Sequence, residues 1–394
     1  MTTSIDEQLE IPCTLMRGGT SKGVYFLTEN LPSAGPERDA ILKAVMGSED
    51  NLQIDALGGS RLVTAKLAIV GKSTREGIDV DYTYGIVPPG RDMVVYTSNC
   101  GNISAGVGPF AIDSGLVNAT EPVTKVRIFN TNTKKLIVAH VPVVNGKARV
   151  SGACAIPGVP GTGAEIFLDY SGTTGAKTGK VLPSGNAVDQ IELESGRTID
   201  VTFGDVANPC VFIRAADLDR SGSELPNAIN EDHELLQSLA EIRAKAALQM
   251  GLCSDWKQAD AVTPALPLVM LVAPAANYVD SEERAVDASS VDLRARMVFY
   301  GKCHESMAGT GSMCLAAMSR IPGTLVHEAA YGSGTWRSDT LRIGHPLGAM
   351  TVNVERSPAA SEKQEPGFER LGLVRTARRL MHGVAYVPRH KLPA

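Results

Sequence analysis

The sequence predicts an α+β protein of two similar domains, each a curled, mostly antiparallel β-sheet around a central helix. Many short segments rich in β-branched and aromatic residues alternate with turns, whereas long helical patterns are few. Two glycine-rich turns, beginning at Cys100 and Ala308, lead into segments of small and apolar residues. A helix of that composition suits burial on all sides, as inside a curled sheet. Because the two copies lie in opposite halves of the chain, they indicate an internal duplication whose helix N-termini face a shared cleft.

The remaining elements follow from local patterns. Strands are expected at residues 23–27, 67–70, 79–84, 93–96, 125–128, 136–144, 148–150, 199–203, 210–213, 268–273 and 349–354. Helices are expected at 37–46 and 231–250, the second with apolar residues on a 3.6-residue repeat and Asp232 near its start. A Gly-, Thr-, Ser- and Pro-rich stretch, 159–186, contains the domain boundary. The expected domains are therefore residues 1–185 and 186–375, with the tail 376–394 packing on the first.

Composition excludes several classes of protein. The chain has 394 residues, a net charge of −5 and no Lys/Arg-rich run, which argues against a nucleic-acid surface. Its seven cysteines are scattered without CxxC pairs, so neither a disulfide framework nor a zinc cluster is expected. The N-terminus is polar and acidic, and no apolar stretch is long enough for a membrane span, so we expect a cytoplasmic protein. An acidic chain that binds an acidic substrate must attract it through local groups.

The first motif, residues 16–26, reads MRGGTSKGVYF. Its glycines and the hydroxyl residues Thr20 and Ser21 stand beside Arg17 and Lys22. Backbone N–H groups in such a turn can form an anion-binding concavity with two cations nearby. The order of residues is not that of a Walker P-loop. The alternative interpretation is a tight turn between two edge strands.

Two further motifs contain reactive side chains. Cys100 is expected at a helix N-terminus, where the positive end of the helix dipole favours the thiolate. The N–H groups of Gly101 and Asn102 could hold a carboxylate there. Lys66 lies two residues after Thr64 and directly precedes an apolar strand, an environment in which an ammonium loses part of the stabilisation of its charge. The alternatives are a buried structural cysteine and a lysine that extends from a strand end to water.

The second half contains a matching turn. Gly309, Thr310, Gly311 and Ser312 could form another carboxylate-binding helix N-terminus. A dinucleotide-binding fingerprint would need a glycine where Cys314 stands, so NAD binding is not expected. No HExxH or GxSxG motif is present. His345, in a GHPLG turn, could lie near a ligand, and a histidine on a surface turn is the alternative.

At these motifs the sequence resembles the methylaconitate isomerase family of the diaminopimelate epimerase superfamily. The resemblance runs through residues 16–26, 55–70, 98–113, 307–317, 342–348 and 374–388, and so covers nearly the whole chain. It implies a diaminopimelate epimerase-like fold with the active site between the domains, and neither a metal nor a coenzyme. Within it, Cys100 falls on the family's reactive cysteine and Lys66 on its reactive lysine.

The resemblance also narrows the chemistry. Related amino-acid epimerases have a second cysteine where this chain has Ala308, which argues against racemisation and leaves Lys66 as the second acid/base group. The family includes 4-oxalomesaconate tautomerases and methylaconitate cis–trans isomerases. Its methylaconitate members commonly have glycine and serine where this chain has Ala56 and Ala65, which favours an oxalomesaconate-type substrate.

The expected function is a cofactor-independent 1,3-allylic isomerase. It would convert 4-oxalomesaconate to 2-keto-4-carboxy-3-hexenedioate in protocatechuate 4,5-cleavage, with Cys100 as base and Lys66 as acid. The expected substrate-binding residues are Arg17, Thr20, Ser21, Lys22, Thr64, Gly101, Asn102, Gly309, Thr310, Gly311, Ser312 and His345. Alternatives are a 2-methylaconitate or aconitate isomerase, an amino-acid racemase and a non-catalytic carboxylate-binding accessory protein. The expected partners are a small polycarboxylate and, from the frequency of two-fold oligomers, a second copy of the chain.

Overall fold

The computed structural model describes residues 7–97, 100–358 and 365–393, and the chain divides into two compact units. Unit 1 comprises Met1–Ala155, Val159–Phe167 and Arg375–Ala394, and unit 2 comprises Ile156–Gly158 and Leu168–Val374. Residues 168–185, which the sequence analysis placed in the first domain, therefore lie in unit 2. Their backbone is bonded to that unit: the N–H of Tyr170 donates to Leu371 O and that of Gly175 to Asp205 O.

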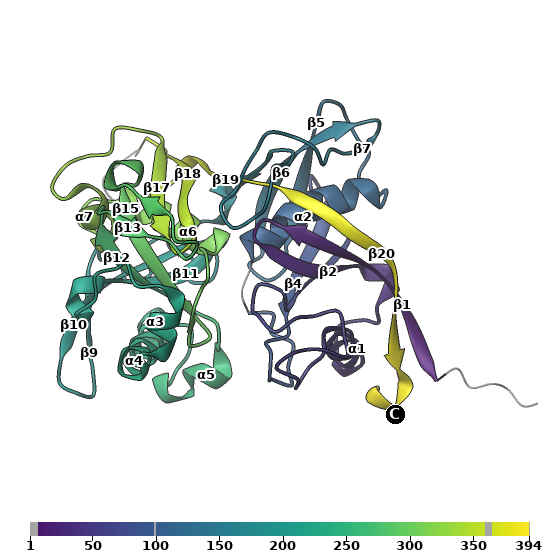
Figure 1. The fold of residues 1–394 in the computed structure, drawn as a ribbon, viewed down its shortest axis with the longest axis horizontal. Coiled ribbons are helices and arrows are strands. Elements are labelled where there is room, and N and C mark those ends of the chain that lie inside the picture. Colours follow the sequence, from purple (N-terminus) through teal and green to yellow (C-terminus); the bar gives the residue numbers. More distant parts are fainter. Residues whose placement is uncertain (1–6, 98–99, 359–364, 394) are drawn as a thin grey trace, which may run out of the picture. The chain divides into compact units, whose positions relative to one another are not determined.

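Unit 1 is a sheet wrapped around one helix. Its strands are β1 (Gln8–Gly18), β2 (Ser21–Leu27), β3 (Lys66–Lys72), β4 (Val80–Ile86), β5 (Val123–Asn130), β6 (Lys135–Val144), β7 (Lys147–Ala148) and β20 (Ala377–Pro388), with β8 (Ile166–Asp169) at the transition to unit 2. Its helices are α1 (Pro36–Met46) and α2 (Gly101–Asp113). Every α2 residue from Gly101 to Ile112 is buried, and α2 contacts strands β1 to β7 and β20. The long strand β20 lies antiparallel to β1, so the C-terminal tail belongs to this unit (Figure 1).

Unit 2 is a second sheet around its own helix. Its strands are β9 (Asp189–Glu192), β10 (Thr198–Val206), β11 (Asn208–Arg214), β12 (Leu268–Pro274), β13 (Tyr278–Val279), β14 (Ala285–Val286), β15 (Leu293–Phe299), β16 (Lys302–Cys303), β17 (Thr340–His345), β18 (Gly348–Arg356) and β19 (Phe368–Arg375). Its helices are α3 (Pro226–Glu231), α4 (His233–Gln249), α5 (Ala259–Val262), α6 (Gly309–Ser319) and α7 (Leu325–Tyr331). All residues of α6 are buried, and this helix contacts β10, β11, β17 and β18. Short 3-10 turns cover Thr28–Asn30, Ser171–Thr173, Ala215–Leu218, Trp256–Gln258, Ala288–Ser290 and Arg389–Lys391 in the two units.

The two units repeat one topology. From β20 to β6 in unit 1, and from β9 to β18 in unit 2, neighbouring strands pair antiparallel, antiparallel, parallel, antiparallel, parallel and antiparallel. A parallel pair needs a long crossover connection, and helices supply it. The central helices α2 and α6 stand in equivalent crossovers, before β5 and before β17. The predicted internal duplication, and the α+β class with mostly antiparallel sheets, are confirmed.

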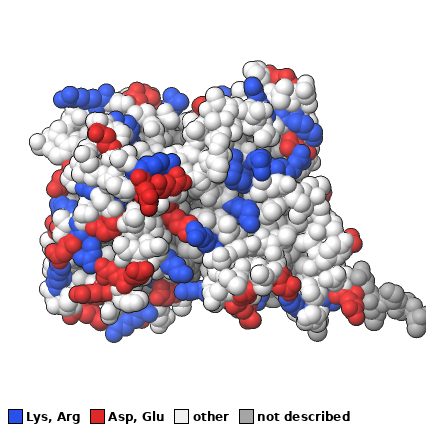
Figure 2. Space-filling model, viewed as in Figure 1, with Lys and Arg blue, Asp and Glu red and all other residues white. Residues whose placement is uncertain are grey.

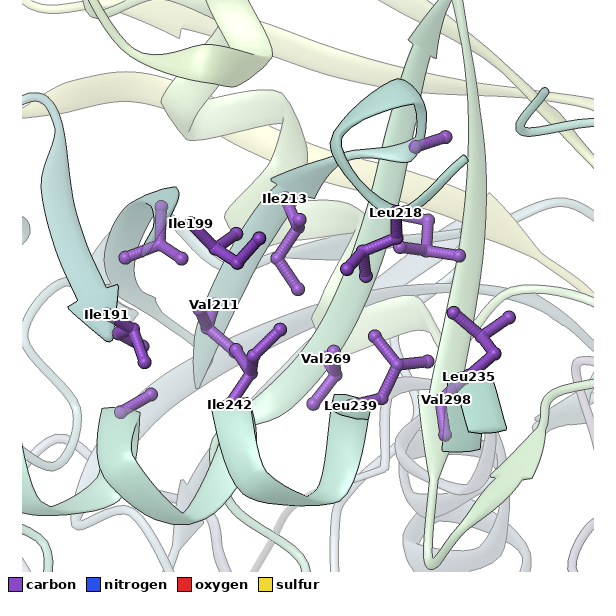
Figure 3. Packing of buried hydrophobic residues seen from close by; sticks show 14 of the residues in the cluster. Ile191, Ile199, Val211, Ile213, Leu218, Leu235, Leu239, Ile242, Val269 and Val298 are labelled. Carbon is purple, nitrogen blue, oxygen red and sulfur yellow. The ribbon is translucent and has the colours of Figure 1, made fainter. Parts of the chain in front are cut away.

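The outer face of the unit 2 sheet is covered by α4. Leu235, Leu239 and Ile242 project from this helix toward Val211 on β11 and Val269 on β12 (Figure 3). Apolar residues at a helical spacing meet apolar residues that alternate along the strands, which is the pattern expected for a helix on a sheet. The predicted helix 231–250 is therefore confirmed, although α4 starts two residues later and ends one residue earlier.

Asp232 caps the N-terminus of α4. Its carboxylate accepts the N–H of Leu235 at 3.0 Å and also pairs with Arg220. We expect Asp232→Ala to lower the free energy of unfolding by about 1 kcal/mol, because an orphaned helix N–H loses its acceptor. Asp232→Asn retains an acceptor and should lose less. Urea unfolding curves measure both, and equal stability of the alanine variant and the parent would contradict the capping role.

Surface charge is mixed over unit 2. On the face seen in Figure 2, acidic and basic side chains intermingle across its left side. Ion pairs within the unit, such as Arg214 with Asp217 and Glu328, place opposite charges next to one another. Among the described residues, no helix is long and apolar enough to cross a membrane.

Candidate functional site

Three segments far apart in the sequence meet at the N-terminus of α2. The antiparallel register of β1 and β2 places Gly18 opposite Ser21, so residues 19 and 20 form the tip of a hairpin. The parallel register of β2 and β3 places Gly23 opposite Lys66, at the start of β3. Cys100 is the N-cap residue of α2. Ser98 and Asn99, which precede Cys100 in its motif, lie outside the described residues.

A lysine and a cysteine are in direct contact at this point. Lys66 Nζ donates to Cys100 Sγ at 3.4 Å and to Ser21 Oγ at 3.0 Å. Lys66 is 4% exposed and Cys100 5% exposed, so the pair is shielded from bulk water. An amine and a thiol held together at a helix N-terminus are suited to removing and returning protons.

Glycines in the hairpin allow this close approach. A Cβ on Gly18 would overlap the carbonyl oxygen of Asn102, and a Cβ on Gly23 would lie 2.8 Å from the carbonyl oxygen of Lys66. Gly19 has φ +52° and lies against the Asn102 side chain, so a side chain there is excluded twice. The MRGGTSKG motif thus contains a hairpin turn that reaches the helix terminus, but β1 lies between β20 and β2, and β2 between β1 and β3, so neither is the edge strand of the alternative interpretation. Anion binding by the motif stays a prediction.

We expect Gly18→Ala to lower kcat/KM by about a hundredfold, because the added Cβ must push the hairpin away from α2 and displace Ser21 from Lys66. Gly383→Ala is the control in the same unit, since its Cβ would meet nothing nearer than Met381 Sδ at 3.5 Å. Steady-state kinetics on both variants check this. Equal activity of the two would show that the close approach at Gly18 has no effect on the site.

Asn102 connects two sides of the site. Arg375 Nε donates to Asn102 Oδ1 at 3.1 Å, and Asn102 Nδ2 donates to Thr20 Oγ1 at 3.0 Å. Arg375 is 6% exposed and was not identified from the sequence, although it lies in the segment 374–388 that carries the resemblance.

Tyr25 is a second residue that the sequence analysis missed. Its hydroxyl donates to the carbonyl of Ile103, in the first turn of α2, at 2.6 Å. Burial, with the nearby Cys100 as the next cause, raises the pKa of Tyr25 well above its usual value, so the phenol stays protonated and keeps this bond. Tyr25 therefore anchors the helix terminus to β2.

Three other predicted residues stabilise the turns around the pair. Arg17 Nη1 donates to the carbonyls of Gly19 at 2.9 Å and Thr376 at 2.8 Å. Burial, with Arg378 nearby as the next cause, lowers the pKa of Arg17. The N–H of Lys22 donates to Val63 O at 2.8 Å. Thr64 closes a turn through its hydroxyl, which donates to Arg61 O at 2.9 Å. Direct contact of Arg17, Lys22 and Thr64 with a substrate stays a prediction.

The remaining predicted site residues lie in unit 2. Gly309 to Ser312 form the first turn of α6, where the hydroxyl of Ser312 donates to Gly309 O at 2.8 Å. Thr310 Oγ1 accepts from Asn208 Nδ2 at 2.9 Å, and both residues are buried. Asn208 was not identified from the sequence. It stands at the β10–β11 turn, the counterpart of the hairpin that contains Thr20 and Ser21 in unit 1.

His345 is buried, so the alternative of a histidine on a surface turn is wrong. It is the last residue of β17 and 1% exposed. Its Nδ1 accepts the N–H of Leu347 at 3.2 Å, and its carbonyl accepts from the hydroxyl of Tyr278 at 3.0 Å. A ligand role for His345 stays a prediction.

Four of the other cysteines are less suited to acid–base chemistry. Burial raises the pKa values of Cys13, Cys154, Cys210 and Cys303, the last to about 12, so these thiols stay neutral. Cys314 is buried within α6, the packing position expected for it. Within the described part of the chain, no three His, Cys, Asp or Glu side chains form a group that could hold a metal ion.

Comparisons with known proteins place the chain among isomerases. A family model described as PrpF protein matches residues 8–388. The 3-methylitaconate isomerase of Eubacterium barkeri is 45% identical over 98% of this chain and 100% of its own length. The (4E)-oxalomesaconate Delta-isomerase of Novosphingobium sp. (strain KA1) is 40% identical over 95% and 97%. The 2-methyl-aconitate isomerase of Cupriavidus necator is 38% identical over 97% and 98%.

Solved structures agree on the fold. A crystal structure of methylitaconate-delta-isomerase has a TM-score of 0.79 and 45% identity, and the match covers 99% of this chain and 98% of that one. A hydroxyproline epimerase from Agrobacterium vitis has a TM-score of 0.55 at 12% identity, over 96% and 92%, which bears on the fold alone. The predicted epimerase-like fold is confirmed.

Proposed function

We propose a reaction on the premise that the chain belongs to the PrpF family, whose members isomerise unsaturated carboxylates. The protein is a 1,3-allylic isomerase: it removes a proton from one carbon of an allyl unit and returns a proton two carbons away. The observation that carries the proposal is the buried contact between Lys66 Nζ and Cys100 Sγ at the N-terminus of α2. Two proton carriers at one point are what a 1,3-shift needs.

In the proposed mechanism, Cys100 as thiolate takes a proton from the carbon next to the conjugated system. The electron pair of the broken C–H bond spreads into a dienolate, which nearby N–H groups and cations stabilise. Lys66 as ammonium then gives a proton to the carbon at the far end, and the double bond moves by one position. The reverse reaction exchanges the two roles.

The contact between the two groups also restores the enzyme. After one turnover the thiol carries the proton that it took, and the lysine lacks the proton that it gave. Because Nζ and Sγ are hydrogen-bonded, the thiol can return its proton to the amine directly. No further residue is needed to close the cycle.

Two substrates are favoured by specific observations. The identity of 45% over essentially the whole of a 3-methylitaconate isomerase makes 3-methylitaconate the first to test. Ala56 and Ala65, together with 40% identity to an oxalomesaconate isomerase, make 4-oxalomesaconate the second. Both are unsaturated carboxylates in which a 1,3-proton shift moves the double bond.

Proton NMR in D2O tests the proposal, with 3-methylitaconate, 4-oxalomesaconate and 2-methylaconitate supplied separately. We expect one of them to isomerise, with deuterium entering at the carbon that Lys66 protonates, because the N–H protons of Lys66 exchange with D2O between turnovers. The substrate with the highest kcat/KM identifies the reaction. No isomerisation and no exchange with any of the three would reject the proposal in favour of a carboxylate-binding protein without activity.

A further inference from the structure

We propose that Asn102 and Arg375 are positioning residues that commit the hydroxyl of Thr20 to donate a hydrogen bond to a substrate carboxylate. The inference rests on the proposed function and adds to it the source of specificity for anions. It follows from one chain of hydrogen bonds, Arg375 to Asn102 to Thr20, whose direction is set by the chemistry of its first member.

Arg375 fixes which groups donate and which accept in this series of hydrogen bonds. A guanidinium has N–H donors and no acceptor, so the atom of Asn102 that faces Arg375 Nε at 3.1 Å must be the amide oxygen. Asn102 is fully buried, which holds its amide in this orientation. The oxygen and nitrogen of the amide are therefore distinguished by their partners.

The same orientation decides what Thr20 can do. The amide nitrogen of Asn102 lies 3.0 Å from Thr20 Oγ1, and an amide N–H can only donate. The Thr20 oxygen thus accepts, and within the described residues its own proton has no protein acceptor. Thr20 is only half-buried, so this proton is left for a ligand.

Ser21, the next residue in the hairpin, is set in the same way. Lys66 as ammonium also has donors only, so Ser21 Oγ accepts from it at 3.0 Å and keeps its proton to donate. The hydroxyl of half-buried Thr20, that of buried Ser21 and the N–H groups at the start of α2 all offer hydrogen atoms. A group that accepts several hydrogen bonds, such as a carboxylate, matches this arrangement, and an ammonium group, which can only donate, does not.

The variant Asn102→Asp tests the series of hydrogen bonds directly. Aspartate has the same shape but accepts at both oxygens, so it keeps the bond from Arg375 and takes the Thr20 proton for itself. We expect the Kd for tricarballylate, a saturated tricarboxylate that cannot isomerise, to rise about tenfold or more, since a bond to a charged group is lost. For the true substrate, KM should rise by more than kcat falls. Thr20→Val should have a similar effect on Kd, and Thr20→Ser should restore binding.

The double variant N102D/T20V separates this mechanism from simple repulsion by the new charge. If Asn102 acts through Thr20, the double variant binds tricarballylate about as weakly as Thr20→Val alone. If the two effects multiply, the aspartate repels the ligand directly and the inference is overturned. A parental Kd in Asn102→Asp, or no binding of tricarballylate by the parent protein, also overturns it.

These binding measurements are independent of turnover. If the parent protein binds tricarballylate but isomerises none of the three candidate substrates, the proposed reaction fails while the hydrogen-bond chain is still judged by Kd. If the parent protein isomerises a substrate and Asn102→Asp leaves both Kd and KM unchanged, the proposed role of the hydrogen bonds is rejected while the proposed reaction is retained. Thermal melting of each variant shows that the changes are not caused by unfolding.

Discussion

Cys100→Ser is expected to lower kcat by about 10²- to 10⁴-fold, because a neutral alcohol is a far weaker base than a thiolate at the same position. The substitution should not lower the stability of the fold. Cys100 is the N-cap of α2 and has no side-chain capping bond, whereas serine is among the residues that cap helices best. Loss of activity with an unchanged or raised melting temperature is therefore the expected combination.

The control for this variant is Cys253→Ser. Cys253 is a partly exposed cysteine of unit 2 that packs, like Trp256, against a small cluster of buried alanines, and it lies outside the proposed machinery. It should retain the kcat of the parent protein. The measurement is initial rates with the substrate identified by NMR. Turnover by Cys100→Ser close to that of the parent would remove Cys100 from the mechanism.

The central helices could be predicted from composition alone. Residues 100–112 and 308–318 combine small and apolar side chains with a glycine-rich start, and each forms a helix buried on all sides. The helix α4 could also be predicted from the sequence, because its apolar repeat and the cap at Asp232 are both local features. The local sequence of such a helix is enough to predict it, and the segments that pack against it need not be known.

Strands that depend on distant partners were harder to predict. The expected strand 93–96 forms only one isolated bridge, between Val95 and Ile86. The longest strands, β1 and β20, were missed, although they pair along almost their full length, because their partners are separated by most of the chain. In β15, Arg294 and Arg296 interrupt the apolar pattern, yet both are buried and bond to backbone carbonyls.

The residues of the candidate site also divide into those that local sequence motifs predict and those that depend on distant partners. Cys100 and Lys66 stand in motifs with recognisable neighbours, and the structure brings their side chains into contact. Arg375 and Asn208 have no local signature, since an arginine and an asparagine are common residues whose importance lies in what they touch. Only the folded chain places Arg375 beside Asn102, 273 positions away in the sequence.

Lys66→Met should lower kcat by a similar factor, about 10²- to 10⁴-fold, by removing the proton donor. Methionine has nearly the length of the lysine stem, so the packing at the start of β3 is preserved. The variant should be at least as stable as the parent, because a buried amine that costs desolvation is replaced by an apolar group. Lys72→Met, at the exposed end of the same strand, is the matched control and should keep full activity.

The double variant C100S/K66M then decides whether the two side chains act as one unit. The effects of residues that act as a unit in one catalytic cycle are not additive, so the double variant should be little slower than the slower single variant. Multiplied losses would mean that each side chain still works when the other is missing, and that their contact at 3.4 Å does not carry the proton that resets the enzyme. Initial rates of the four proteins on one substrate make this distinction, provided that each variant melts as cooperatively as the parent.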